Sequence, residues 1–140
     1  MRWLRSGAVT MTDTETDVAE VVLRAFHAAS HENPLARGRL VGMRVDGVDR
    51  WAVVILRHGL DADVHVEEVW SVTRGGGRAA MTVLCAIADT HGASIELDAI
   101  PLKAGPAGVQ MTRKRLRRWY ASLGFRQVLS SDTMIRPARQ

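Results

Sequence analysis

The chain has 140 residues, 46% of them hydrophobic and 24% charged, with a formal net charge of +4. This length matches one ordinary domain, and no apolar run approaches the roughly 20 residues of a membrane span, so we expect a cytoplasmic protein without a membrane partner. Cys85 is the only cysteine, which excludes an intrachain disulfide, and the residues imply no metal. The modest positive charge suits anionic ligands but does not indicate nucleic-acid binding.

Residues 1–16 are expected to form a flexible segment, because "TMTDTETD" has no apolar period that could be buried. The pattern changes at Asp17, and residues 17–140 are expected to form a single domain. Asp17 and Glu20 have the spacing of an N-cap and an N3 residue, and valines and alanines follow at helical spacing. The pattern predicts a helix over about 17–31 that ends before Pro34.

The next part of the chain is rich in β-forming residues. The runs 39–45 and 50–57 are joined by the turn signal "DGVD" and predict an antiparallel hairpin. Residues 63–72, "DVHVEEVWSV", predict a further strand. A run of glycines follows, and after it an apolar helix that packs deeply is predicted, with Gly92 placed to end it.

The C-terminal part predicts one more strand, a loop, a helix and a hairpin. The strand covers 93–99, and the loop over 100–110, "IPLKAGPAGVQ", is long enough to face a ligand. Helical spacing then runs from Leu116 to Leu123, with Gly124 as the stop. Residues 125–137 read as a final hairpin. The sequence therefore predicts a single α/β domain with a mixed sheet.

The stretch "TRGGGRAAM" places three glycines between a strand and a helix. Glycines allow a sharp turn that bares backbone N–H groups, and a helix N-terminus adds partial positive charge, so the stretch predicts an anion site. A glycine-rich connection without a ligand is the plain alternative. The sequence does not favour a P-loop, because the Lys-Ser/Thr pair that would follow the glycines is absent.

A dinucleotide fingerprint is a more serious rival. Gly75, Gly77 and Ala80 fit G-x-G-x-x-A, and Glu96 or Asp98 stands about 20 residues on, where a ribose ligand would belong. Such a fingerprint normally opens a doubly wound parallel sheet, and too few strand-helix units remain in this chain for one.

The same residues satisfy another pattern. Residues 74–79, "RGGGRA", fit [QR]-x-x-G-x-[GA], and "RRWYASLGF" at 117–125 contains a helix that ends Tyr-x-x-x-Gly-Phe. In both motifs the chain resembles the GCN5-related N-acetyltransferases. The resemblance covers about 65–136 and implies a mixed sheet with a splayed central parallel strand pair. It also implies transfer of an acetyl group from acetyl-coenzyme A to a primary amine by direct attack.

The resemblance assigns the donor to a wedge between the strands around 66–72 and 94–99. There, freed backbone groups would pair with the pantetheine arm. The residues implied in donor binding are Val69, Trp70, Val72, Arg74, Gly75, Gly76, Gly77, Arg78 and Ala79. The amides of 75–79 would hold the pyrophosphate, and Arg74 or Arg78 would add charge-assisted contacts.

Four side chains are candidates for the chemistry. The resemblance assigns Tyr120 as the group that protonates or steadies the departing thiolate. A base must take the proton of the amine, and Glu67 and Glu68 lie on the predicted splayed strand, with His65 a further candidate. Regular alternation places Glu68 on an apolar face with Val66, Trp70 and Val72, which favours Glu68 over Glu67.

Several questions stay open at this stage. The acceptor could be a small amine, a peptide amine or a modified base, and the sequence also leaves open a homodimer. The family's usual asparagine after the second splayed strand is absent. The basic cluster of Arg113, Lys114, Arg115, Arg117 and Arg118 is read as a solvated helix face or as an attraction for the cofactor's 3′-phosphate. A non-catalytic coenzyme A-binding module with the same fold is the main alternative.

Overall fold

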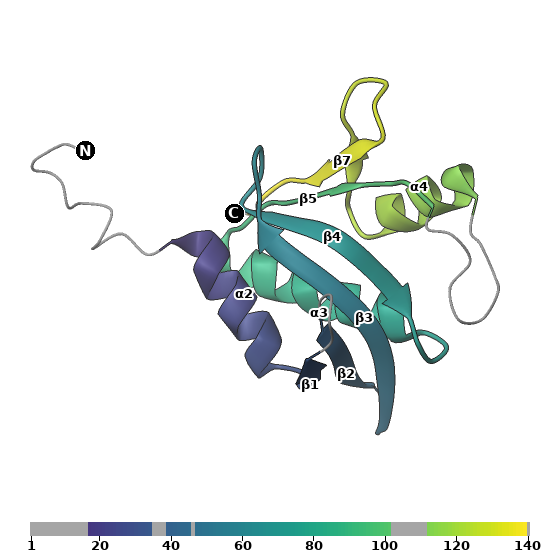
Figure 1. Ribbon diagram of the computed structural model, residues 1–140. Helices are drawn as coiled ribbons and strands as arrows, with labels where there is room; N and C mark the ends of the chain where they lie inside the picture. Colours follow the sequence, from purple (N-terminus) through teal and green to yellow (C-terminus); the bar gives the residue numbers. More distant parts are fainter. Residues whose placement is uncertain (1–16, 35–38, 46, 102–111, 140) are drawn as a thin grey trace, which may run out of the picture.

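The computed structural model describes residues 17–34, 39–45, 47–101 and 112–139. The predicted flexible segment and most of the predicted 100–110 loop lie outside these residues. In chain order the elements are α2 (Val18–Ala28), β1 (His31–Pro34), β2 (Arg39–Val45), β3 (Val48–His58), β4 (Val64–Ser71), α3 (Gly76–His91), β5 (Ile95–Asp98), α4 (Arg113–Ser122), β6 (Arg126–Gln127) and β7 (Thr133–Arg136). The predicted α/β class with a mixed sheet is confirmed (Figure 1).

The strands form one seven-stranded sheet in the order β1-β2-β3-β4-β5-β7-β6. Neighbouring strands are antiparallel except for β4 and β5, the central pair, which are parallel and are connected through α3. The predicted hairpin of β2 and β3 forms with Val45 opposite Val48, and Gly47 takes the left-handed backbone (φ 77°) that such a tight turn requires.

The first helix begins as the sequence predicted. The Asp17 carboxylate accepts hydrogen bonds from the amides of Ala19 (3.0 Å) and Glu20 (3.4 Å). The helix ends at Ala28, short of the predicted 31, because His31 already belongs to β1. The sequence analysis missed β1, a four-residue edge strand whose last residue is a proline, and edge strands are where sheets tolerate proline.

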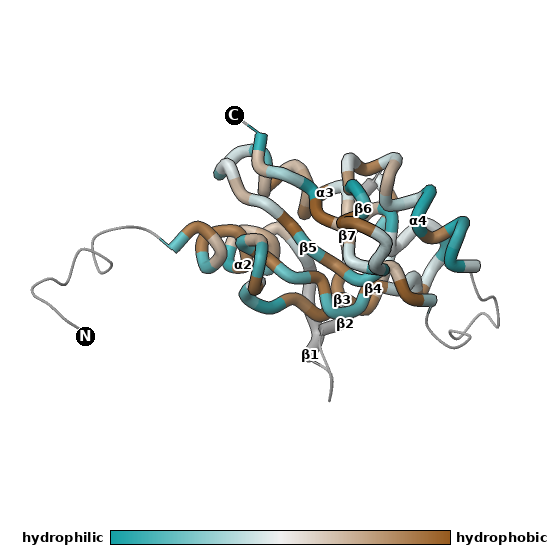
Figure 2. Tube along the Cα trace, turned by 90° about the horizontal axis from the view of Figure 1, so that it is seen from above, coloured by the Kyte–Doolittle hydropathy of each residue, from teal (hydrophilic) through white to brown (hydrophobic). Residues whose placement is uncertain are grey.

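Helices α2 and α3 lie side by side on one face of the sheet (Figure 1). The core between them and the sheet is apolar, and the mostly apolar α3 contrasts with the polar α4 in Figure 2. The sheet residues of this core are Val41, Met43, Ala52, Val54, Val64, Val66, Ile95, Leu97 and Met134. None of the described helices is long and apolar enough to cross a membrane.

Candidate functional site

The parallel strands β4 and β5 are paired over only part of β4. Three registered pairs join Val64–Val66 to Ile95–Leu97, whereas β4 continues to Ser71 alongside β3. Backbone groups of a strand point alternately to its two neighbours. Beyond Val66, therefore, the groups of β4 that point away from β3 have no partner in β5.

A β-bulge lies where the two strands part. Leu56 of β3 is opposite Val66, but Ile55 is opposite Glu68, so Glu67 is an extra residue on β4. The bulge resets the alternation, and Val66 and Val69 both pack toward α3. Glu68 and Trp70 consequently lie on the other face. The prediction that Glu68 shares a face with Val66 was therefore wrong, because it assumed a regular strand, whereas the shared face with Trp70 is kept.

The two candidate glutamates lie in different surroundings. Glu67 is exposed, and its carboxylate accepts a hydrogen bond from Nε of Arg57 on β3 at 3.3 Å, in an ion pair whose side chains are each 43% exposed. Glu68 is half-buried and is cross-strand from Ile55. Glu68 therefore lies on the face of the β3–β4 pair away from α3, beyond the last residue of β4 that pairs with β5.

A buried pair that the sequence analysis did not assemble lies at the base of the same strand. The distance between His65 Nδ1 and Glu96 Oε2 is 2.7 Å, and the two residues are 7% and 4% exposed. They come together because β4 and β5 are in parallel register with His65 opposite Glu96. Register between strands 31 residues apart has no short-range sequence signal, so His65 and Glu96 were considered separately.

The second oxygen of Glu96 is also fully engaged. Oε1 accepts hydrogen bonds from the amides of Leu60 (2.9 Å), Asp61 (2.8 Å) and Ala62 (2.7 Å) in the β3–β4 turn. Burial alone would raise the pKa of Glu96, but the hydrogen bonds from His65 and these amides outweigh it and lower the pKa below its ordinary value. Glu96 is therefore a carboxylate and is occupied within the fold, which removes it as a ribose ligand.

The glycine stretch forms the turn from β4 into α3. Gly75 is the N-cap in a left-handed conformation (φ 79°). Two hydrogen bonds to β3 hold the turn. The Arg50 side chain donates to the carbonyl of Arg74 (2.9 Å), and Oγ1 of Thr73 accepts from the backbone amide of Trp51 (2.8 Å). The turn is thus fixed in place rather than a slack hinge.

Only part of the predicted row of free amides is available. The Gly76 amide donates to the carbonyl of Thr73, the Gly77 amide to Ser71 Oγ, and the Ala79 amide to the carbonyl of Gly75. The amides of Gly75 and Arg78 donate no hydrogen bond within the described part of the chain. The expectation that all five amides of 75–79 face a ligand is therefore wrong for the fold as it stands.

Packing explains one of the glycines without any ligand. A Cβ on Gly76 would lie 1.8 Å from the carbonyl oxygen of Trp51, so the backbones of α3 and β3 approach too closely for a side chain. Gly75 needs its left-handed φ, whereas a Cβ on Gly77 would meet Ser71 Oγ at 3.1 Å. Part of the glycine pattern is therefore structural.

The charges at this helix start are unusual. The first turn of α3 contains no acidic residue, and the exposed Arg74 and Arg78 side chains have no ion-pair partner among the residues that the structure describes. The N-terminus of a helix already carries partial positive charge, and nearby cations therefore destabilise the helix. A bound anion would relieve this repulsion.

Tyr120 lies in the last turn of α4. It is 6% exposed, it packs on Phe125 with ring centroids 5.7 Å apart, and it belongs to the core cluster on the α3 side of the sheet. Burial raises the pKa of Tyr120 to about 12, so the hydroxyl keeps its proton at neutral pH. Within the described residues the Tyr120 hydroxyl makes no hydrogen bond.

The basic cluster on α4 is partly used within the fold. Arg117 binds Asp132 at 2.8 Å, and Arg113 approaches the same carboxylate at 3.5 Å. Lys114, Arg115 and Arg118 are exposed. This supports the reading of the cluster as a largely solvated face, with two members that hold the β6–β7 turn.

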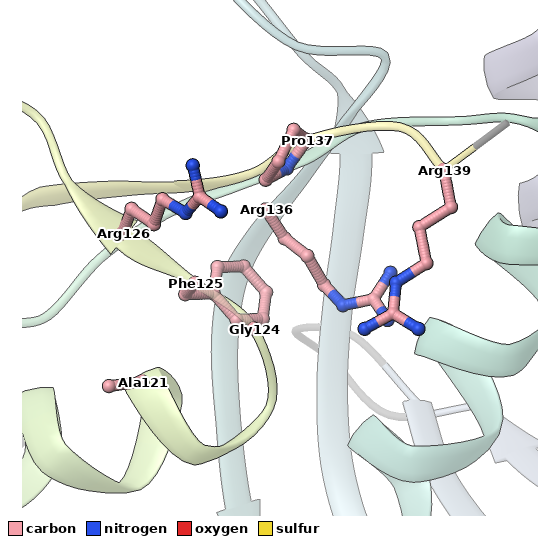
Figure 3. Close-up of a pocket in the computed structure, with 7 residues that line it drawn as sticks. All are labelled: Ala121, Gly124, Phe125, Arg126, Arg136, Pro137 and Arg139. Atoms are coloured by element: carbon pink, nitrogen blue, oxygen red, sulfur yellow. The ribbon is translucent and has the colours of Figure 1, made fainter.

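A cavity of about 290 Å³ lies at the far end of α3 from the glycines (Figure 3). Its lining residues are Ala121, Gly124, Phe125, Arg126, Arg136, Pro137 and Arg139. The buried Arg136 donates hydrogen bonds to both carboxylate oxygens of Asp89 (2.6 and 3.0 Å) and to the carbonyl of Leu123 (2.8 Å). Arginines at the C-termini of two helices are accounted for by the helix dipoles, so we assign no ligand to this cavity.

Comparison with protein-family models, with curated proteins and with solved structures finds no match to this chain.

Proposed function

We propose that the protein is an N-acetyltransferase with a GCN5-related fold, which transfers an acetyl group from acetyl-coenzyme A to a primary amine. One observation carries the proposal: the two central parallel strands pair over Val64–Val66 only, and the helix that connects them starts at the open end. The gap and the helix N-terminus are then adjacent, as an extended donor with a diphosphate requires.

The residues present fit that donor. The pantetheine arm contains two amide groups, which match the backbone groups of β4 that lack a β5 partner beyond Val66. The diphosphate fits the amides of Gly75 and Arg78 and the side chains of Arg74 and Arg78, which have no partner among the described residues. The donor contacts of Gly76, Gly77 and Ala79 would require the present hydrogen bonds to exchange.

The groups proposed to accept the amine proton and to protonate the departing thiolate lie on opposite faces of the sheet. Tyr120 belongs to the core on the α3 side, whereas Glu68 and His65 are on the other face of β4. A thioester between β4 and β5 is open to both faces. An amine can therefore attack from the Glu68 and His65 side, while Tyr120 gives a proton to the departing sulfur from the α3 side.

The sheet does not favour the dinucleotide alternative. In the described residues β4 and β5 are the only parallel pair, whereas a doubly wound dinucleotide fold needs several. Glu96 is buried and occupied, and Asp98 accepts a hydrogen bond from Thr133 at 2.8 Å. Neither acid is placed as a free ribose ligand next to the glycines.

The test is a binding and turnover assay with acetyl-coenzyme A. Calorimetry measures donor binding, and thiol release is followed with polyamines, aminoglycosides, lysine peptides and aminated nucleosides as acceptors. Tyr120→Phe should keep donor affinity within about threefold and lower kcat by about 100-fold, a typical effect of losing a general acid. Absence of donor binding would contradict the proposal, and binding without turnover of any acceptor would favour a non-catalytic coenzyme A-binding module.

A further inference from the structure

The hydrogen bond between the buried His65 and Glu96 has only one possible direction. An ionised carboxylate only accepts hydrogen bonds, so the proton in the 2.7 Å contact must be on Nδ1 of His65. The neutral imidazole then has its free lone pair on Nε2. In the described part of the chain Nε2 makes no hydrogen bond, and it is not sealed from solvent.

The pair also lies at the right place. His65 is one residue before Val66, the last residue of β4 that pairs with β5, and its side chain is on the same face as Glu68. The three turn amides on Glu96 Oε1 prevent that carboxylate from rotating away. The imidazole is consequently held at the start of the gap in one orientation.

We propose that His65 is the proton acceptor of the transfer reaction and that Glu96 is the residue that positions it and fixes its tautomer. This inference rests on the proposed function and chooses His65 over Glu68. Imidazole exchanges protons near neutral pH, and a carboxylate on its second nitrogen stabilises the imidazolium that forms.

The proton balance of the step is complete. The amine nitrogen forms a bond to the thioester carbon, the carbon–sulfur bond breaks, and His65 Nε2 takes the proton of the amine directly or through one water. Tyr120 gives its proton to the thiolate and regains one through solvent as His65 releases its own. No oxidant or further reactant is needed.

Other charged groups near His65 do not replace Glu96 in this role. Arg57 is its cross-strand neighbour on β3 but is bound to Glu67. Asp98, two residues after Glu96 on β5, is exposed and accepts a hydrogen bond from Thr133. Glu68 lies further along β4 on the same face.

The first experiment is nitrogen-15 NMR of the ligand-free full chain. The neutral His65 should be the Nδ1–H tautomer. In Glu96→Gln the amide oxygen is expected to keep the three turn amides, so its NH₂ group would donate to Nδ1 and force the Nε2–H tautomer. An Nε2–H tautomer in the unaltered protein would overturn the proposal without any activity measurement.

The second experiment is kinetic. His65→Gln should lower kcat by about 100-fold or more, leave the KM for acetyl-coenzyme A within about threefold, and abolish the acid limb of the kcat/KM profile. Glu96→Gln should lower kcat in parallel with its tautomer change. His91→Gln, at the exposed end of α3, is the matched control and should retain the activity of the unaltered protein.

The outcomes separate this inference from the proposed function. If the unaltered protein neither binds nor consumes acetyl-coenzyme A, the proposed function fails. If it turns over and His65→Gln keeps kcat within about threefold, or if Glu68→Gln loses more activity than His65→Gln, the assignment of the base is wrong while the transferase stands.

Discussion

The buried hydroxyl of Tyr120 makes the free energy of unfolding depend on pH in the alkaline range. Burial raises its pKa to about 12 from the ordinary 10, so the unfolded chain releases this proton first as the pH rises. The stability that this group contributes is fully present below pH 10 and is lost as the pH rises toward 12. At 1.4 kcal/mol per pKa unit, the loss amounts to about 3 kcal/mol.

Tyr120→Phe should remove that loss. The difference in free energy of unfolding between the variant and the unaltered protein should shift in favour of the variant by about 3 kcal/mol between pH 9 and pH 12. Urea unfolding at each pH measures it. The chain contains one tyrosine, so the tyrosinate absorbance gives the pKa directly, and a value near 10 would contradict the burial of this hydroxyl.

Gly76 and Gly47 are glycines for two different physical reasons. A Cβ at Gly76 collides with the Trp51 carbonyl, whereas Gly47 has a positive φ with nothing within 4 Å. We expect Gly76→Ala to cost about 3 kcal/mol or more, as severe overpacking does. Gly47→Ala should cost about 1 kcal/mol for its left-handed backbone. Equal losses in urea unfolding would mean that α3 does not approach β3 this closely.

The bulge on β4 is an element-scale feature that can be removed cleanly. Deletion of Glu67 would place Glu68 directly after Val66, so Leu56 and Ile55 would keep their partners and every side chain its face. The ion pair with Arg57 would be lost, but exposed pairs contribute little. The deletion should therefore change the unfolding free energy by less than about 1 kcal/mol.

Donor binding should respond differently to that deletion. A bulge increases the local twist of its strand, and this one lies where β4 leaves β5. Without it we expect the affinity for acetyl-coenzyme A, measured by calorimetry, to fall at least tenfold while the circular dichroism spectrum is retained. Unchanged affinity would show that the parting of the strands has another cause.

Removing the charge of Arg78 at the start of α3 should raise the stability of the free protein and weaken donor binding. Replacing Arg78 by Gln removes a cation from a helix N-terminus and should stabilise the free protein by about 0.5 kcal/mol. The same change should weaken acetyl-coenzyme A binding about tenfold, because a charge-assisted contact to the diphosphate is lost. Arg118→Gln, exposed on α4, is the control; loss of both stability and binding in Arg78→Gln would mean that Arg78 has a structural role.

Local signals in the sequence predicted most elements of this fold. Asp17 as a cap, the Asp-Gly turn before β3 and Gly92 in its left-handed C-cap are each decided within a few residues. The strand β1 was missed because three polar residues and a proline at an edge leave no alternating pattern. The bulge at Glu67 was missed because it depends on the register of β3, not on β4 itself.

The candidate site divides in the same way. Tyr120 and the glycine turn have linear motifs, and the structure places them at the ends of α4 and α3. The contact of His65 with Glu96 and the internal use of the Gly76 and Gly77 amides depend on tertiary packing. Sequence reasoning found the residue types there but could not determine which groups are already occupied.

Across the whole molecule, the fold consists of an antiparallel half, β1 to β4, and a smaller half, β5 to β7, joined by three registered pairs and by α3. The donor that we propose would bridge these halves at their weakest connection. Its binding should therefore change local protection more than global stability, since amides next to the gap exchange by small openings.

Hydrogen exchange with mass spectrometry tests this expectation. Adding coenzyme A should slow exchange in peptides that cover 67–71 and 75–79. Amides of β4 without a β5 partner, and amides of the α3 turn without a partner in the described part of the chain, would then gain one. Peptides of β1 and β2 are separated from the gap by β3 and β4 and should change little. In Arg78→Gln the same concentration of coenzyme A should protect these peptides less. Uniform slowing of all peptides would instead indicate general stabilisation by mass action, and no change at 67–71 would mean that the gap does not hold the donor.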